Sequence, residues 1–347
     1  RIAMNAFDLY RTKLSKAGIF DYLQSLIIKL RQNISYSYPK DPLDVHIEEC
    51  KTILPFTKSI EHDCTVLVSN KLSTIYKNGN NIIKNTKDPK KVKENIHEAF
   101  VGLKCINNVA RHTPHFSKIK GITTDYDLVS EYAGDDSKTF FSWLSGTEFD
   151  FDEYIYILYQ IGIGLHVAQR MYGFVHNDLF PWNVMLKPHE QAYECVLDRD
   201  TVVAVNAGTL PLVIDYGKSR VTYKSKCYEF ITTQQPGTQY STVYDVLCIL
   251  ISSLSVIIRA KQIKKDRDPD LLRLVNFVSG TEFHPDKFTT FQQARQFVFD
   301  NSSFSSILTL ELKDLNKVTP MCFCRYLYEN FASSLKNRIE IRQVQMI

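Results

Sequence analysis

The chain has 347 residues, which at about 150 residues per domain corresponds to two domains or one large two-lobed domain. Hydrophobic residues make up 44% and charged residues 23% of the sequence, a globular balance that excludes a wholly disordered or fibrous chain. A formal net charge of +4 is too small to predict nucleic-acid binding from electrostatics alone.

The first 60 residues predict a helical extension ahead of the rest of the chain. Apolar residues recur at helical spacing between positions 19 and 30, and Pro39 and Pro42 end that run. We therefore assign residues 1–60 to this extension, because the character of the sequence changes after it.

Short β-like segments follow the extension. They cover residues 65–69, 73–77 and 81–85. Asn78-Gly79-Asn80 separates the last two, and asparagine next to glycine between two such runs predicts a hairpin. A helix is expected next, over residues 91–109, because apolar residues recur there on one face.

A strand and two long helices are expected in the middle of the chain. Residues 127–134 form a short apolar strand that closes on Gly134 and has the character of a connector. From Asp152 apolar residues repeat at helical spacing, and Gly173 supplies the expected C-terminal stop. A second apolar helix is expected around residues 246–258.

The most informative stretch follows Gly173. Residues 174–185 read Phe-Val-His-Asn-Asp-Leu-Phe-Pro-Trp-Asn-Val-Met, and residues 211–217 read Pro-Leu-Val-Ile-Asp-Tyr-Gly. These two segments resemble the catalytic core of the protein kinases. Asp178 with Asn183 matches the catalytic-loop motif, and Asp215 begins a D-Y-G sequence where the family has D-F-G.

This resemblance implies a site for phosphoryl transfer. In-line transfer needs a carboxylate near the acceptor hydroxyl and oxygen ligands that hold magnesium on the nucleotide phosphates. Asp178, Asn183 and Asp215 would be the catalytic residues, with Asn183 and Asp215 as ligands of Mg²⁺ and ATP as the nucleotide. The competing interpretation is that Asp178 caps a turn and Asp215 ends a strand by chance, and the correct order of the two motifs disfavours it.

Further positions are assigned to nucleotide binding by their order in the family pattern. Glu98 resembles the helix glutamate that pairs with a strand lysine. Lys84 is the first choice for that lysine and Lys71 the second, and either could also be an ordinary exposed lysine. Glu131 to Ala133 resembles the hinge, whose backbone binds adenine.

Other polar residues are expected to be structural. His176 corresponds to a packing residue of the catalytic loop, and Asp245 resembles the helix aspartate that holds this loop by hydrogen bonds. His112 and His115 have no partner motif, so we interpret them as surface or core residues.

A closer resemblance is to the divergent kinase-like proteins of large nucleocytoplasmic DNA viruses. It rests on residues 97–103, 114–116, 176–179 and 208–217. It covers roughly residues 90–255. In that group an expanded segment separates the catalytic-loop asparagine from the D-F-G-like aspartate, and 32 positions separate the two here. The resemblance implies a viral source.

The resemblance also implies an α+β, two-lobed protein-kinase-like fold. We expect the N-lobe and hinge at residues 61–134 and the C-lobe at residues 135–347. The expanded segment, residues 187–207, is expected to form an added hairpin before the D-Y-G element, from strands near 193–197 and 201–205.

Several features of the family are missing. Gly79 is the only glycine between residues 60 and 90, so no glycine-rich loop is visible. Asn177 stands where an arginine usually follows the catalytic-loop histidine, and Phe180 stands where serine/threonine kinases have a lysine. No A-P-E element follows Gly217, although Pro236-Gly237 lies in that segment.

Two classes of function remain open. The first is a divergent protein kinase that transfers the γ-phosphate of ATP to serine or threonine hydroxyls. The alternative is a catalytically weak or inactive pseudokinase that acts as a nucleotide-binding or structural interaction module. Small-molecule kinases share the catalytic-loop pattern, but Gly217 disfavours them. The expected partner is a protein substrate or a viral or host protein, and neither nucleic acid nor membrane is indicated.

The cysteines and the apolar runs predict the compartment. Eight cysteines lie dispersed in apolar stretches, which favours reduced core thiols over a disulfide framework. One residue separates Cys322 from Cys324, a spacing that does not suit a zinc knuckle. No signal peptide opens the sequence, and the run 246–258 is too short for a bilayer. We expect an intracellular, reducing compartment, namely the host cytoplasm, and the sequence leaves open whether the protein is also packaged in the virion.

Overall fold

The computed structural model describes residues 42–58, 64–230, 243–262, 265–279, 290–301 and 319–343. The chain divides into two compact units, Arg1–Val45 and His46–Ile347. The first unit is described only where helix α3 (Pro42–Ile53) begins. The helical run expected between positions 19 and 30 lies outside the described residues, as does Pro236-Gly237.

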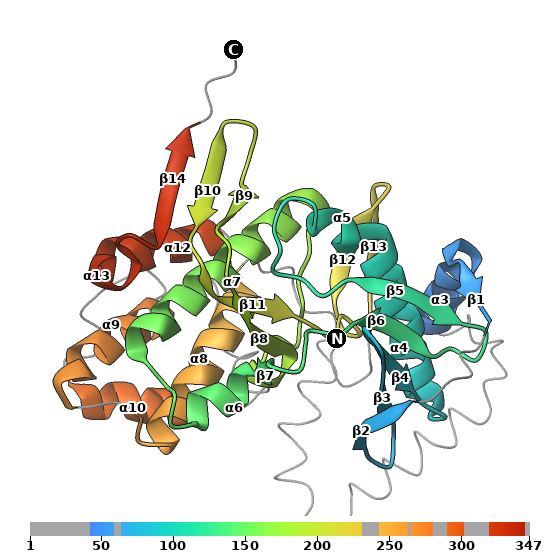
Figure 1. Cartoon of the computed structure of the whole chain (residues 1–347), viewed down its shortest axis with the longest axis horizontal. Helices are drawn as coiled ribbons and strands as arrows, with labels where there is room; N and C mark the ends of the chain where they lie inside the picture. The colour runs from blue at the N-terminus through green and yellow to red at the C-terminus, as the bar shows by residue number, and fades with distance from the viewer. Residues whose placement is uncertain are drawn as a thin grey trace, which may run out of the picture. The chain divides into compact units, whose positions relative to one another are not determined.

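The second unit mixes helices and sheets, so its class is α+β. Its largest sheet has six strands in the order β1-β5-β6-β4-β3-β2 (Figure 1). The strands are β1 (Phe56–Thr57), β2 (Thr65–Ser69), β3 (Thr74–Asn78), β4 (Asn81–Asn85), β5 (Ile119–Thr123) and β6 (Leu128–Glu131). The predicted hairpin joins β3 to β4, and Gly79 turns it at a φ of 54°. Strand β1 pairs in parallel with β5, although the sequence assigned residues 1–60 to a helical extension.

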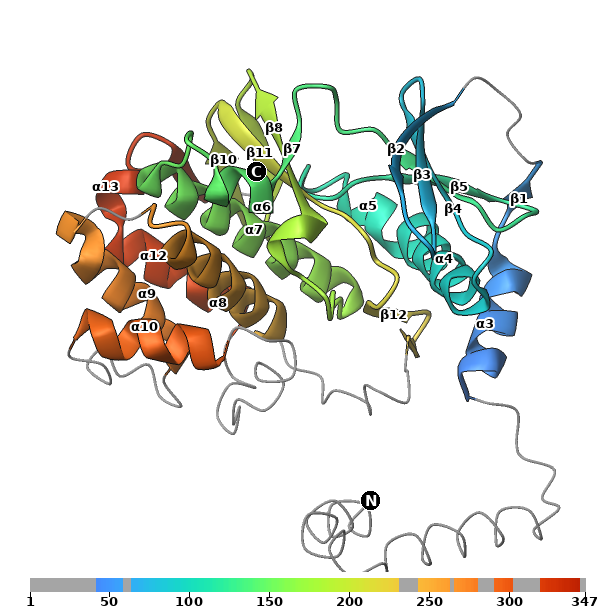
Figure 2. The ribbon, with the colours of Figure 1, turned by 90° about the horizontal axis from the view of Figure 1, so that it is seen from below.

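Helix α4 (Pro89–Val101) covers one face of this sheet (Figure 2). Asp88 caps the helix by accepting a hydrogen bond from the backbone N–H of Lys91, and Pro89 takes the first helical position. The side-chain amide of Asn95 donates to the backbone carbonyl of Lys84 at 3.1 Å. This bond fixes the register between α4 and strand β4.

The helix predicted over residues 91–109 is interrupted. After α4 the chain forms a π-helix, η1 (Gly102–Ile106), and then the short helix α5 (Asn107–Val109). A side chain at Gly102 would begin 2.1 Å from Cγ1 of Ile119, so only glycine lets this segment lie against β5.

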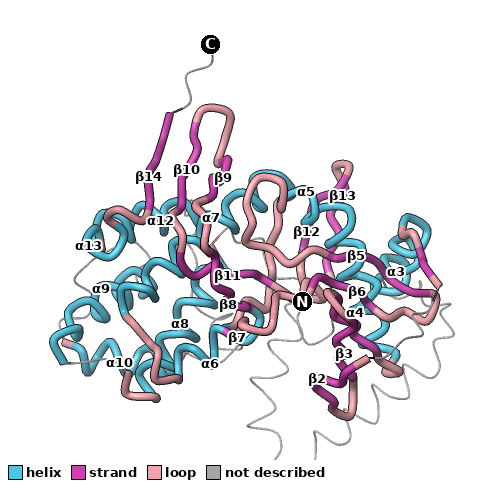
Figure 3. The backbone as a smooth tube through the Cα atoms, in the orientation of Figure 1, coloured by secondary structure: helices cyan, strands magenta, loops and turns pink. Residues whose placement is uncertain are grey.

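The remaining helices lie together, away from the six-stranded sheet (Figure 3). They are α6 (Phe140–Ser145), α7 (Phe151–Tyr172), α8 (Tyr244–Arg259), α9 (Asp268–Ser279), α10 (Phe291–Asp300), α12 (Pro320–Asn330), α13 (Ala332–Leu335) and the 3-10 turn η3 (Lys265–Arg267). Helix α7 is almost entirely buried, and Gly173 ends it in the left-handed conformation at a φ of 55°, as predicted. Helix α8 is also buried along most of its length.

Three smaller sheets complete the unit. One has the order β11 (Gly208–Val213), β8 (Val184–His189), β7 (Lys138–Thr139), and the 3-10 helix η2 (Pro181–Asn183) leads into it. The second has the order β14 (Ile339–Gln343), β10 (Thr201–Val205), β9 (Tyr193–Val196), and the third pairs β12 (Arg220–Tyr223) with β13 (Lys226–Glu229). The segment between Asn183 and Asp215 therefore runs through β8, β9, β10 and β11, with β9 antiparallel to β10.

All eight cysteines are free thiols. The prediction that they lie in the core is right for five of them, Cys50, Cys105, Cys195, Cys248 and Cys324. It is wrong for Cys227, which is exposed on β13, and Cys64 and Cys322 are half-buried. None of the helices in the described part of the chain combines the length and apolar character that a bilayer crossing requires.

Candidate functional site

Lys84 joins residues from three elements. It leaves strand β4, and its Nζ lies 2.9 Å from Oε2 of Glu98 on helix α4. The same Nζ lies 3.1 Å from Oδ1 of Asp215, which follows strand β11. The structure therefore brings together three of the residues that the sequence nominated. Asp215 is far along the chain from the other two.

Glu98 uses both of its carboxylate oxygens. Oε2 faces Lys84, while Oε1 accepts a hydrogen bond from the backbone N–H of Tyr216 at 3.1 Å. Glu98 is only 3% exposed, so a change in its position moves both partners. Helix α4 is in this way tied to the backbone beside Asp215.

Burial and charge act in opposite directions on the three side chains. Burial lowers the pKa of Lys84, but the carboxylates of Asp215 and Glu98 outweigh it and the net shift is upward. Burial raises the pKa of Asp215, but the Lys84 ammonium outweighs it and the net shift is downward. For Glu98 burial prevails and raises the pKa. Lys84 and Asp215 are thus charged near neutral pH.

Two residues of the site have a left-handed backbone. The φ of Asp215 is 64° and that of Asn177 is 63°. Such conformations cost about 1–3 kcal/mol outside glycine and persist where the surroundings enforce them. Here the carboxylate of Asp245 accepts from the backbone N–H of Asn177 at 3.0 Å, and the side chain of Asn177 donates to the carbonyl of Lys218 at 3.1 Å.

His176 and Asp245 hold the loop that carries Asp178. The buried Asp245 on α8 accepts from the backbone N–H of His176 at 2.7 Å, which is the structural contact that the sequence predicts. Nε2 of His176 lies 2.9 Å from the carbonyl of Ile214, and Nδ1 accepts from the N–H of Asp178 at 3.3 Å. His176 is fully buried and links the loop to Ile214, which lies between strand β11 and Asp215.

Asp178 and Asn183 are connected through the backbone. The side-chain amide of Asn183 donates to the carbonyl of Asp178 at 2.8 Å. The carbonyl of Asn183 in turn accepts from the N–H of Ile214 at 3.0 Å, next to Asp215. Because the amide nitrogen is committed, Oδ1 of Asn183 is the atom left to act as a ligand. Carboxylate and amide oxygens form a donor set that suits a hard cation such as Mg²⁺.

Lys218 is a site residue that the sequence analysis missed. Its Nζ lies 2.7 Å from Oδ2 of Asp178, and both side chains are partly exposed. Its position directly after Gly217 of the D-Y-G element is the sequence feature that could have identified it. The lysine expected two positions after Asp178 is instead Phe180, which stacks on Trp182 with ring centroids 4.7 Å apart.

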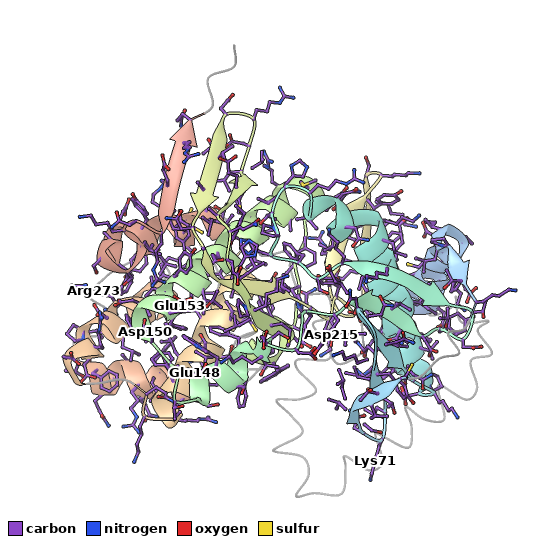
Figure 4. All side chains as sticks on the ribbon, viewed as in Figure 1. Lys71, Glu148, Asp150, Glu153, Asp215 and Arg273 are labelled. Carbon is purple, nitrogen blue, oxygen red and sulfur yellow. The ribbon has the colours of Figure 1, made fainter. Side chains whose placement is uncertain are left out.

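Lys71 lies away from the site. It is exposed in the turn between β2 and β3, and Figure 4 shows it far from Asp215. In the same turn the side chain of Asn70 accepts hydrogen bonds from the N–H groups of Leu72 and Ser73, at 2.8 and 2.9 Å. These backbone donors are therefore occupied within the turn.

Glu131 and Ala133 lie where β6 leads toward β7. The backbone N–H of Glu131 donates to the carbonyl of Lys118 at 2.9 Å. Ala133 lines a cavity of about 450 Å³ together with residues of the segment after it and of the β8–β9 turn. Of the two predicted hinge residues, the structure thus places only Ala133 at this cavity.

Comparison with known proteins gives distant relatives. No family model matches the chain. Uncharacterized protein 179R of Invertebrate iridescent virus 6 is 25% identical over 302 residues, which is 75% of this chain and 25% of that protein. Probable kinase 098L of Invertebrate iridescent virus 3 is 25% identical over 181 residues, which is 51% of this chain and 34% of that protein.

A third relative comes from an animal. The serine/threonine-protein kinase haspin homolog of Drosophila melanogaster is 27% identical over 156 residues, which is 39% of this chain and 26% of that protein. The chain thus spans about a quarter to a third of the length of the curated relatives it matches. It is similar to viral proteins and to proteins named as kinases.

Proposed function

We propose that this chain is a divergent protein kinase that transfers the γ-phosphate of ATP to serine or threonine hydroxyls. The observation that carries the proposal is the position of Lys84 between Glu98 and Asp215, at 2.9 and 3.1 Å. A protein kinase needs this lysine–glutamate pair and the metal-binding aspartate at the same place. The similarity to proteins named as kinases supports the same conclusion.

The proposal divides the chain into two lobes. Strands β2 to β6 with α4 would form the N-lobe and hinge, residues 61–134, to whose sheet β1 adds a strand from outside this range. The elements from β7 onward would form the C-lobe, residues 135–347. The pair of strands β9 and β10 would be the added hairpin before the D-Y-G element. The backbone of Glu131 and Ala133 would bind adenine at the hinge, beside the cavity that Ala133 lines.

Each polar residue of the site then has a chemical role. Asp178 accepts the proton of the acceptor hydroxyl as its oxygen bonds to the γ-phosphorus, and the bond from this phosphorus to the bridging oxygen of ADP breaks. Lys84 holds the nucleotide phosphates, and Glu98 holds Lys84. Asp215 and Asn183 would bind Mg²⁺, which offsets the negative charge of the phosphates.

Lys218 compensates for one departure from the family pattern. The position two residues after Asp178 is Phe180, so no ammonium group comes from the catalytic loop. Lys218 supplies one from the segment after Asp215, 2.7 Å from the carboxylate of Asp178. In the reacting complex this ammonium would lie close to the transferred phosphate.

A pseudokinase is the second candidate, and the turn at Asn70 favours it. Kinases cover the phosphates with a glycine-rich loop whose backbone N–H groups face the nucleotide. Here Asn70 occupies the N–H groups of Leu72 and Ser73, so they are not free to bind phosphate. A chain with this turn would bind nucleotide weakly and act through a viral or host protein partner.

Phosphate transfer from γ-labelled ATP decides between the two candidates. The acceptors are general protein substrates and the chain itself, and the variants are Asp178→Asn and Asp215→Asn. We expect each variant to lose transfer by at least about 100-fold, because removal of one group that acts on the reacting atoms costs at least that much. The control is Glu194→Gln, which removes an exposed carboxylate paired with Arg342 on β14, and it should keep full activity.

Full activity in the Asp215→Asn variant would exclude the assignment. Transfer to a small-molecule acceptor but not to protein would exclude serine/threonine specificity. No transfer by the unmodified chain, with partner binding unchanged in both variants, would favour the pseudokinase.

A further inference from the structure

Three side chains that can bind metal meet between helices α3 and α4. His46 and Cys50 lie four residues apart on one face of α3, and His97 lies on α4. One nitrogen of each histidine and the sulfur of the cysteine lie within 4.8 Å of one another. Cys50 and His97 are fully buried, and His46 is half-buried. No step of the proposed phosphate transfer uses these residues.

Two of the three distances between these atoms lie within about half an ångström of those in a tetrahedral zinc site. Nε2 of His46 lies 2.9 Å from Nδ1 of His97 and 3.8 Å from Sγ of Cys50. Zinc bonds of about 2.0–2.1 Å to nitrogen and about 2.3 Å to sulfur place tetrahedral ligands roughly 3.3–3.6 Å apart. Nδ1 of His97 and Sγ of Cys50 lie within 4.8 Å of each other, so an ion would draw these two side chains together.

His97 is already oriented as a ligand. Its Nε2 lies 2.8 Å from the backbone carbonyl of Ser219, so Nε2 carries the hydrogen and donates it there. The lone pair of a neutral ring is then on Nδ1, which faces His46. Metal-binding histidines typically donate their second ring N–H to a carbonyl or carboxylate in this way.

We propose that His46, Cys50 and His97 bind one zinc ion, with water in the fourth position. Imidazole nitrogen and thiolate sulfur select zinc over the magnesium of the proposed active site, which prefers oxygen ligands. The neighbouring Glu49 is not a fourth ligand, because its carboxylate is bound by Lys226 and by the hydroxyl of Tyr228. Within the described ranges no other set of three histidine, cysteine or acidic side chains converges in this way.

The ion would connect α3 to two segments of the proposed active site. It would join α3 to α4 directly, and through the Ser219 carbonyl it would reach the segment that follows Asp215. His97 precedes Glu98 on α4, so the ion would also stiffen the helix that positions the partner of Lys84. The role we assign to zinc is therefore to stabilise the arrangement of α4.

Cobalt binding tests the site without any need for activity. The full chain is stripped with a chelator and titrated with Co²⁺, because thiolate-bound cobalt gives a sulfur-to-metal absorption band in the near ultraviolet. We expect about one Co²⁺ per chain, with this band, and displacement by Zn²⁺. The Cys50→Ser variant should lose the band and bind the metal at least about 10-fold more weakly.

Cys105→Ser is the matched control. Cys105 is also fully buried, but it lies in the π-helix outside the cluster, so this variant should keep both the band and the stoichiometry. Circular dichroism checks that each variant is folded. His46→Gln, at the half-buried position, provides a second variant that retains the thiol, and it should bind cobalt at least about 10-fold more weakly.

Two outcomes would overturn the proposal. One is a stoichiometry far below one ion per chain, which would leave His46 and His97 as an ordinary buried hydrogen bond. The other is an unchanged band in Cys50→Ser, which would assign binding to other thiols. Neither outcome affects the proposed kinase function, because the readout is independent of ATP.

Discussion

Asp215 shows how single residues are held in an unusual conformation at this site. Its φ of 64° turns the carboxylate toward Lys84, while the next residue, Tyr216, donates its backbone N–H to Glu98. The hydroxyl of Tyr216 lies 2.7 Å from the carbonyl of Ser117 and 2.8 Å from that of Val213, and its single proton is shared between the two. These contacts offset the cost of the left-handed backbone and keep Asp215 in place.

The short motifs identified some of these residues and not others. Asp178, Asn183 and Asp215 stand in two compact segments, and the resemblance of these segments to the kinase motifs nominated them. The choice between Lys84 and Lys71 depends on which lysine side chain faces α4. The pairing register of the strands decides this, and a local pattern does not show it. His46 and Cys50 carried no motif, because their partner His97 lies on a different helix.

Replacement of Lys218 should slow phosphate transfer. In the Lys218→Met variant we expect kcat to fall by about 100-fold while KM for ATP stays nearly constant, because the ammonium acts next to Asp178 on the transferred phosphate. Steady-state kinetics measure both constants. Lys104→Met removes a half-buried lysine of the π-helix and should leave them unchanged. An altered KM with a constant kcat would show that Lys218 binds substrate only.

At the scale of elements, the helix over residues 91–109 was predicted as one continuous helix and is interrupted by a π-helix. The apolar periodicity located the buried face, which includes Ile96 and Phe100. It could not reveal the interruption at Gly102, because this depends on the closeness of Ile119 on β5. The periodicity of a single segment carries no information on which distant residue will pack against it.

The Gly102→Ala variant tests this packing. Its new Cβ would lie 2.1 Å from Cγ1 of Ile119, and such overpacking costs about 1–3 kcal/mol, more than the gain of about 1 kcal/mol from better helix propensity. We expect a lower midpoint of thermal unfolding. At Gly121 the nearest atom to a new Cβ is Oγ1 of Thr57 at 4.0 Å, so Gly121→Ala serves as the control and should be nearly neutral. Equal midpoints in both variants would contradict the packing argument.

In the whole molecule, the α+β class and only some of the strands and helices followed from the sequence. Alternation and turn residues marked the strands β2, β3 and β4, and apolar periodicity marked α7 and α8. The order of the strands in the sheets did not follow, because it depends on pairings across long stretches of chain. The pairing of β14 with β10 is the clearest case, since it joins the last described strand to the middle of the chain.

We propose that Lys84, Glu98 and Asp215, together with Asn183, form a nucleotide site that requires magnesium. Thermal unfolding of the purified chain with millimolar ATP, with and without Mg²⁺, tests it most directly. A ligand at 100 times its dissociation constant adds about 2.7 kcal/mol of stability. We predict a rise in the unfolding midpoint that depends on Mg²⁺ and is lost in the Asp215→Asn variant. No rise in the unmodified chain, or an equal rise in that variant, would exclude a magnesium-dependent nucleotide site at Asp215.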